Sequence, residues 1–136
     1  VLLDRTKALD DRLAGIDHLH VHGIGGKFSD QPAEVEAAAR RCLAPLAVDA
    51  SEPDPVLPVF SSGQWAGTLK TTADAVGAPD FMFLAGGGIL AHPDGPSAGV
   101  ASLRQAYEAI AEGRTLDDHA ERRPELKAAM AFFGGR

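Results

Sequence analysis

Three short apolar segments, each ending in a glycine- or serine-rich loop, constrain the fold of this chain more than any other feature. They span residues 16–22, 56–60 and 81–84, and a helical pattern follows each one. Apolar runs of this length predict strands, and helical connections between them predict right-handed crossovers in a parallel sheet. Because the carboxyl ends of parallel strands meet at one edge, the three loops predict one shared ligand site.

Helices are predicted from apolar spacing and from residues typical of helix ends. Asp30 is the expected N-cap of one helix, Pro32 lies in its first turn, and Glu34 suits its positive end. Gly77 and Gly113 are the expected end points of two others. The predicted helices span residues 3–14, 32–46, 66–76 and 97–112, with one or two short helices in residues 117–133.

The size of the chain leaves two α/β architectures open. Three strands cannot close a barrel, and an eight-stranded β/α barrel needs about 250 residues, whereas this chain has 136. The sequence therefore predicts either a small open sheet or the last part of a barrel. Val1, and not Met, is the first residue and stands just before a helical pattern, so we expect the chain to be truncated at its N-terminus.

Composition and net charge limit the kinds of partner that this chain is expected to bind. The formal net charge is −6 and there is no run of Lys or Arg, which argues against nucleic acid and anionic membranes as partners. A small anion remains possible because local N–H groups bind it. Cys42 is the single cysteine, so no intrachain disulfide forms, and a cytoplasmic location is expected. No signal peptide or apolar run of about 20 residues is present.

His20 is the best ligand candidate in the first strand. Leu19 and Val21 alternate with His18, His20 and His22, which gives one apolar and one imidazole face. Alternate residues on a strand are about 6.6 Å apart, so two of these histidines could share a metal but three could not easily do so. Phosphate binding by His20 and ordinary hydrogen bonding of the other two are the competing interpretations.

Lys27 follows glycines at positions 23, 25 and 26 and is a lone cation on a flexible segment. Such a loop can close over a substrate and bring the ammonium to a developing negative charge. The spacing does not match the phosphate-loop motif G-x-x-x-x-G-K-[ST]. A surface lysine without function is the alternative.

Ser61, Ser62 and Gly63 follow the second strand and precede a helix, so hydroxyl and N–H groups there suit a sugar oxygen or a phosphate. Gln64 and Trp65 are candidates to line the same pocket. The nucleophile elbow G-x-S-x-G is absent, and a role in turn formation alone stays open.

Gly86, Gly87 and Gly88 follow the third strand, where bare backbone can approach an anion closely. A tight exit from the strand is the alternative explanation for three glycines. Their position directly after an apolar strand favours the anion site.

Three motifs in order resemble the C-terminal part of the RuBisCO large-subunit superfamily. Asp17–His20 with Lys27 is similar to the sixth barrel strand and its mobile loop, Leu57–Gly63 to the seventh strand, and Gly86–Gly95 to the eighth strand and its phosphate loop. The resemblance covers nearly the whole chain. It implies that residues 1–136 form about strands 6 to 8, with their helices, of a TIM (β/α)8 barrel.

The resemblance also implies roles for the candidate residues. His20 would bind the distal phosphate of a phosphorylated sugar, Lys27 would close on the reacting centre, and Ser61 would contact a substrate oxygen. Backbone N–H groups for the other phosphate are implied at Gly63, Gly86 and Gly87.

Departures from the family pattern favour a RuBisCO-like protein over a carboxylase. Val21–Gly23 stands where carboxylases usually have Ser-Gly-Thr, and Ser62 stands in place of a second glycine. Ala85 replaces an aromatic residue and Asp94 a tryptophan. RuBisCO-like proteins enolise or isomerise other sugar phosphates or thiosugar phosphates without fixing carbon dioxide.

The resemblance implies a cofactor and a partner that this chain does not supply. The family's Mg²⁺ site, a carbamylated lysine with two acidic residues, lies upstream of Val1, so no metal ligand is expected here and the 136 residues alone are expected to be inactive. A neighbouring subunit completes the pocket in the family, which implies a homodimer or higher homo-oligomer. The alternatives are a true carboxylase fragment, an inactive phosphate-binding or assembly module, or an unrelated open α/β domain whose strands pair non-sequentially.

Overall fold

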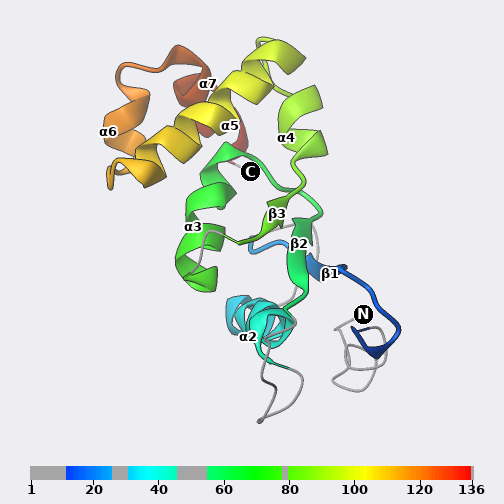
Figure 1. The fold of residues 1–136 in the computed structure, drawn as a ribbon. Helices are drawn as coiled ribbons and strands as arrows, with labels where there is room; N and C mark the ends of the chain where they lie inside the picture. The colour runs from blue at the N-terminus through cyan, green and yellow to red at the C-terminus, as the bar shows by residue number, and fades with distance from the viewer. Residues whose placement is uncertain (1–11, 26–30, 46–54, 78–79, 136) are drawn as a thin grey trace.

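The chain folds as strands that alternate with helices (Figure 1). The structure is a computed structural model that describes residues 12–25, 31–45, 55–77 and 80–135. The predicted helix over residues 3–14 falls almost wholly outside these residues, as does Lys27. In chain order the elements are β1 (His18–His22), α2 (Pro32–Leu43), β2 (Leu57–Ser61), α3 (Ala66–Val76), β3 (Met82–Phe83), α4 (Gly86–Leu90), α5 (Pro96–Ala111), α6 (Leu116–Ala120) and α7 (Pro124–Phe133).

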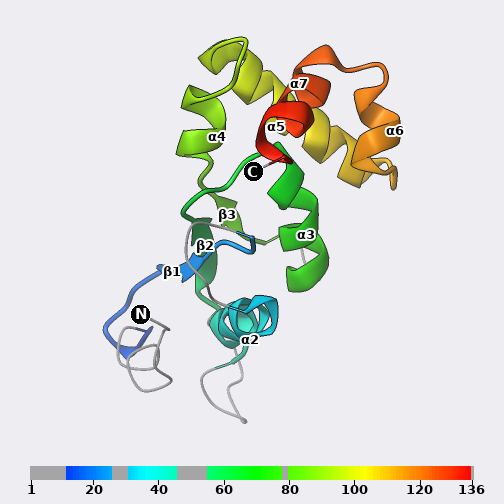
Figure 2. The same cartoon turned by 180° about the vertical axis from the view of Figure 1, so that it is seen from behind.

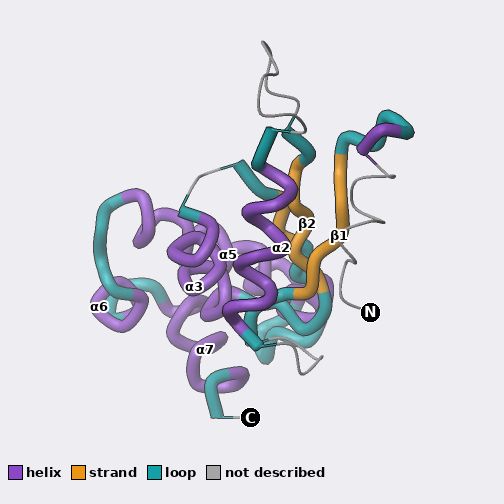
Figure 3. Tube along the Cα trace, turned by 90° about the horizontal axis from the view of Figure 1, so that it is seen from below, coloured by secondary structure: helices purple, strands orange, loops and turns teal. Residues whose placement is uncertain are grey.

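The three strands form one parallel sheet in the sequential order β1-β2-β3, as the crossover pattern predicts. His20 pairs with Val59, and Val59 pairs with Met82. The sequential order removes the alternative that required another strand order. Figure 3 shows β1 and β2 side by side with α2 beside them.

One face of the sheet is covered by helices. Leu19 and Val21 of β1 and Phe60 of β2 are buried there against α2 and the end of α3. The apolar positions that alternate with histidines in β1 are the buried ones, because successive side chains of a strand point to opposite faces. We call this the helix-covered face and the other the histidine face.

A second apolar cluster joins α3 to the helical layer, by which we mean α5, α6 and α7. Leu69 of α3 packs with Ala106 of α5 and with Leu126 of α7, and Leu126 is completely buried. Figures 1 and 2 show the helical layer at one end of the sheet and α2 at the other. None of the helices within the described ranges has the length and hydrophobicity needed to cross a membrane.

The structure differs from the sequence prediction at both ends of α2 and by one additional helix. α2 ends at Leu43 with Ala44 as its C-cap, so it is shorter than the predicted span of residues 32–46. The N-cap of α2 is Gln31 and not Asp30, and the Gln31 N–H donates to the Glu34 carboxylate at 3.2 Å. The glycine triplet forms the first turn of a short helix, α4, that the sequence does not predict. Glycine is a poor helix former, so α4 depends on its tertiary contacts.

Candidate functional site at the carboxyl ends of the strands

The loops after the three strands lie next to one another, as the parallel arrangement requires. The N–H of Gly23 after β1 donates to the carbonyl of Ser61 at 2.8 Å, and the N–H of Leu84 after β3 donates to the carbonyl of Phe60 at 2.9 Å. We call residues 23–25, 62–65 and 84–88 the strand-end loops. The predicted meeting of the three loops at one edge is confirmed.

His20 and Ser61 come together on the histidine face. His20 Nδ1 and Ser61 Oγ lie 3.3 Å apart and share a hydrogen bond whose direction depends on the imidazole tautomer. The His20 side chain is exposed, whereas Leu19 and Val21 beside it are buried. An imidazole and a hydroxyl, 41 residues apart in the sequence, thus form one polar pair at the carboxyl edge.

The turn after β2 has an unusual backbone. Ser62 and Gly63 both have a φ of 73°, and Ser62 is the one non-glycine residue with a positive φ in the described part of the chain. A serine held in the left-handed region costs about 1 kcal/mol or more. Gly63, which is exposed, supplies the freedom that the second left-handed residue requires.

The three glycines of α4 have different surroundings. A Cβ added at Gly86 or Gly87 would meet nothing within 4 Å, whereas one at Gly88 would lie 2.7 Å from the carbonyl oxygen of Gln64. The first hydrogen bond of the helix runs from the N–H of Ile89 to the carbonyl of Ala85 at 2.9 Å. The N–H groups of Gly86 and Gly87 therefore precede the helical hydrogen bonds and remain available to a ligand.

Gln64 does not line an open pocket, which differs from the sequence expectation. Its side chain is 1% exposed and lies against Gly23, where an added Cβ would come within 1.8 Å of Gln64 Nε2. The sequence gives no signal for this contact, because Gly23 and Gln64 are far apart in the chain and adjoin only through strand pairing.

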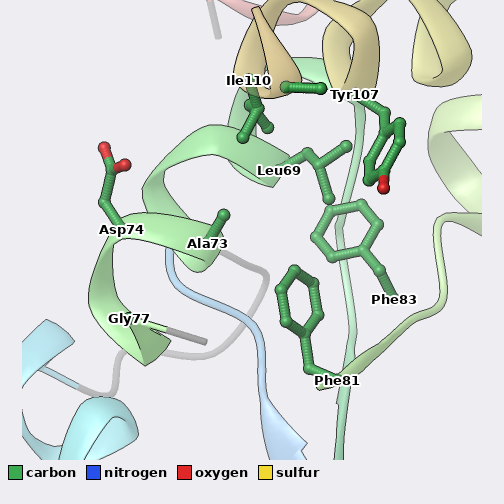
Figure 4. A pocket seen from close by; sticks show the side chains of 9 residues that line it. Leu69, Ala73, Asp74, Gly77, Phe81, Phe83, Tyr107 and Ile110 are labelled. Atoms are coloured by element: carbon green, nitrogen blue, oxygen red, sulfur yellow. The ribbon is translucent and has the colours of Figure 1, made fainter. Parts of the chain in front are cut away.

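An apolar cavity lies elsewhere in the part of the chain that the structure describes. It has a volume of about 510 Å³ and opens between α3, α5 and the start of β3 (Figure 4). Phe83, which lines it, pairs with Phe60 and so lies on the helix-covered face, opposite His20. None of the site residues predicted from the sequence lines this cavity, so it is separate from the candidate site.

The metal interpretation of the histidines in β1 requires ligand side chains that lie close together. The residues that the structure describes contain no group of three or more His, Cys, Asp or Glu side chains placed to hold a metal ion. His18, His20 and His22 are therefore not such a group of three. The assignment of Lys27 as a catalytic residue stays a prediction, because Lys27 lies outside the described residues.

The fold and the site together indicate a class of protein. A sequentially paired parallel sheet with returning helices on one face and polar groups at the carboxyl ends of its strands is the arrangement of β/α-barrel enzymes. A sequence model of the ribulose bisphosphate carboxylase large chain, catalytic domain, matches residues 6–133, so the chain belongs to that family.

Two curated relatives are similar over most of the chain. The uncharacterized ribulose bisphosphate carboxylase-like protein of Bordetella bronchiseptica is 50% identical over 121 residues, which are 88% of this chain and 29% of that protein. The 3-oxo-isoapionate-4-phosphate transcarboxylase/hydrolase of Xanthobacter autotrophicus is 48% identical over 122 residues, which are 90% of this chain and 29% of that protein. This chain therefore spans less than a third of the length of these relatives.

Solved structures agree with this assignment. The crystal structure of a rubisco-like protein from Burkholderia fungorum superimposes with a TM-score of 0.84 at 57% identity, covering 89% of this chain and 30% of that one. The octameric Rubisco from Pyrococcus horikoshii has a TM-score of 0.79 at 34% identity, covering 93% of this chain and 29% of that one. The predicted fold class, a C-terminal part of a β/α barrel, is confirmed.

Proposed function

We propose that this chain is the C-terminal, phosphate-binding part of a RuBisCO-like enzyme that enolises or isomerises a phosphorylated sugar or thiosugar. The observation that carries the proposal is the contact of His20 with Ser61, 3.3 Å apart, at the edge where the strand-end loops meet. It pairs two residues that the sequence singles out separately as ligands of a sugar phosphate.

The proposed binding uses two kinds of donor. His20 addresses one phosphate through its imidazole, which its hydrogen bond to Ser61 orients, and the Ser61 hydroxyl remains in reach of a substrate oxygen. The backbone N–H groups of Gly63, Gly86 and Gly87 bind the second phosphate, because glycine lets an anion approach the backbone closely. Lys27 closes on the reacting centre and stabilises the negative charge that develops there.

The relatives support the substrate class. The Xanthobacter protein is named for a substrate that carries both an oxo group and a phosphate. Its name also describes a transcarboxylase and hydrolase, so the class of reaction is the part of the proposal that the experiment below decides.

Three further parts of the proposal concern the whole protein. Magnesium, with ligands from outside this chain, would polarise the substrate carbonyl. A homodimer or higher homo-oligomer and a cytoplasmic location also belong to the proposal. The octameric state named for the Pyrococcus Rubisco supports self-association.

Solvent exchange of a substrate proton tests the proposal. The full-length enzyme with magnesium is incubated in D₂O with 3-oxo-isoapionate 4-phosphate or ribulose 1,5-bisphosphate, and deuterium next to the carbonyl is followed by NMR. Wild-type enzyme is expected to incorporate deuterium into at least one of them. Lys27→Ala is expected to lower the exchange rate by about a hundredfold or more, the scale measured for loss of one donor at a developing anion.

The control is Lys70→Ala, which removes an exposed lysine paired with Asp74 on α3 and should leave exchange unchanged. Binding of inorganic phosphate without any exchange would indicate the inactive phosphate-binding module instead. Exchange that is as fast in Lys27→Ala as in the wild type would contradict a catalytic loop.

A further inference from the structure

Gln64 connects all three strand-end loops. Its side chain is 1% exposed and its carboxamide fills the space next to Gly23 after β1, where a Cβ would lie 1.8 Å from Nε2 and 2.1 Å from Cδ. The backbone carbonyl oxygen of Gln64 and the Cα of Trp65 would each lie 2.7 Å from a Cβ on Gly88, which follows β3. Glycine at positions 23 and 88 thus allows the loop after β2 to contact both neighbours.

Packing alone does not explain why a carboxamide occupies this position. Gln64 Nε2 donates to the carbonyl of Ser62 at 3.1 Å, whereas Oε1 is buried without a hydrogen-bond partner among the residues described. An unpartnered buried acceptor costs free energy that an apolar side chain of equal length, such as methionine, would not cost. The hydrogen bond to Ser62 is therefore what glutamine offers here and methionine does not.

The carbonyl that accepts from Gln64 belongs to Ser62, whose backbone is strained. Ser62, with a φ of 73°, is followed by Gly63, also at 73°, and is preceded by Ser61, whose hydroxyl contacts His20. A left-handed serine persists only where surrounding contacts fix it. The orientation of the Gly63 N–H depends on this turn, as does the position of Ser61 beside His20.

We propose that Gln64 is a positioning residue for the phosphate site. Through its hydrogen bond to the Ser62 carbonyl it holds the Ser62–Gly63 turn in the conformation that aims the Gly63 N–H and the Ser61 hydroxyl at the anion. The inference rests on the proposed function and adds to it a residue that contacts no substrate atom. Loss of one neutral hydrogen bond then weakens phosphate binding by about tenfold, the scale of such a bond.

Two measurements on the full-length enzyme test this assignment. Calorimetric titration with inorganic phosphate gives the phosphate affinity, and thermal denaturation gives the stability. Gln64→Met keeps the length of the side chain and removes both the donor and the unpartnered oxygen. Its phosphate affinity is expected to fall about tenfold while its melting temperature stays at or above that of the wild type.

Gln105→Met is the matched control. Gln105 on α5 has both ends of its carboxamide paired, with the Glu125 carboxylate at 2.7 Å and with the N–H of Leu126 at 2.9 Å. Its replacement is expected to lower the melting temperature and to leave phosphate affinity within twofold. The two glutamines thus separate loss of positioning from loss of stability.

A second route tests the same contact without relying on one variant. Gly23→Ala displaces the carboxamide, because the new Cβ would overlap Nε2. Gln64→Ala removes the carboxamide. Each single variant is expected to lose about tenfold in phosphate affinity, and the double variant no more than either, because both disrupt one interaction.

The outcomes distinguish the two proposals. A wild-type enzyme that binds no phosphate overturns the proposed function and this inference together. Normal phosphate binding by both Gln64→Met and Gly23→Ala overturns the positioning role alone. So does an affinity loss that merely follows the melting temperature in all variants, Gln105→Met included.

Discussion

The strand-end loops and the helical layer differ in how completely their buried polar groups are hydrogen-bonded. In the contact of α5 with α7, Gln105 uses both its carboxamide oxygen and its nitrogen. Before α5, the Nε2–H of the buried His92 donates to the Glu125 carbonyl at 3.0 Å, and Nδ1 accepts from the N–H of Asp94 at 3.1 Å. The hydrogen bond from Gln105 is also the largest cause that lowers the pKa of Glu125.

The strand-end loops do not pair all of their buried polar groups. Gln64 Oε1 is buried without a partner among the described residues, and Ser62 has a left-handed φ. Gly86 and Gly87 stand before the first hydrogen bond of α4, with open space beside them. This contrast is the one expected if the strand-end loops bind a ligand and the helical layer serves stability alone, because strain and unpaired polar groups persist at functional sites. The comparison predicts that substitutions in the two regions affect different measurements.

Leu126→Ala should have the largest effect on stability, and on stability alone. Leu126 is completely buried between α3, α5 and α7, and replacing such a leucine by alanine costs about 3 kcal/mol through lost burial and the cavity left behind. Thermal denaturation of the full-length enzyme measures the loss, and phosphate affinity should stay within twofold. A parallel loss of affinity would show that the two regions do not act separately.

Gly88→Ala should have the next largest effect on stability and should also lower phosphate affinity. The new Cβ would lie 2.7 Å from the Gln64 carbonyl oxygen and from Trp65 Cα, which are backbone atoms that cannot rotate away. Overpacking of this kind costs about 2 kcal/mol, and it also moves α4 relative to the Ser62–Gly63 turn. A lower melting temperature with unchanged phosphate affinity would contradict the view that the loops position one another.

The sequence predicts the sheet and much of the candidate site because both follow local rules. Alternation of Leu19 and Val21 with histidines fixes the faces of β1, and parallel pairing then brings His20 to Ser61. The predicted roles of His20, Ser61, Gly63, Gly86 and Gly87 stay predictions, as does that of Lys27, until binding is measured.

The features that the sequence does not predict depend on contacts between distant segments. A run of three glycines disfavours a helix, yet α4 forms where Gly88 packs on the loop after β2 and Gly99 of α5 packs on Ile89. The role of Gln64 depends likewise on Gly23, which only the pairing of β1 with β2 brings close. Such contacts leave no periodic signal in the chain.

Gly87→Ala should have the smallest effect on stability, and in the opposite direction. Gly87 lies in a helix with nothing within 4 Å of an added Cβ, so alanine should raise stability by up to about 1 kcal/mol through its better helix propensity. Phosphate affinity should nonetheless fall, because the methyl group occupies the space through which an anion approaches the N–H groups of α4.

The matched control for this last variant is Gly113→Ala at the end of α5. Gly113 is also in open space but has a φ of 66°, so alanine there should cost about 1 kcal/mol and leave phosphate affinity unchanged. The two substitutions thus add the same methyl group, one at the candidate site and one in the helical layer. Their expected effects on stability are opposite, and only the one at Gly87 is expected to change phosphate affinity. If Gly87→Ala raised the melting temperature and bound phosphate as tightly as the wild type, an anion site at the start of α4 would be excluded, and the two exposed glycines of that helix would have no explanation in ligand binding.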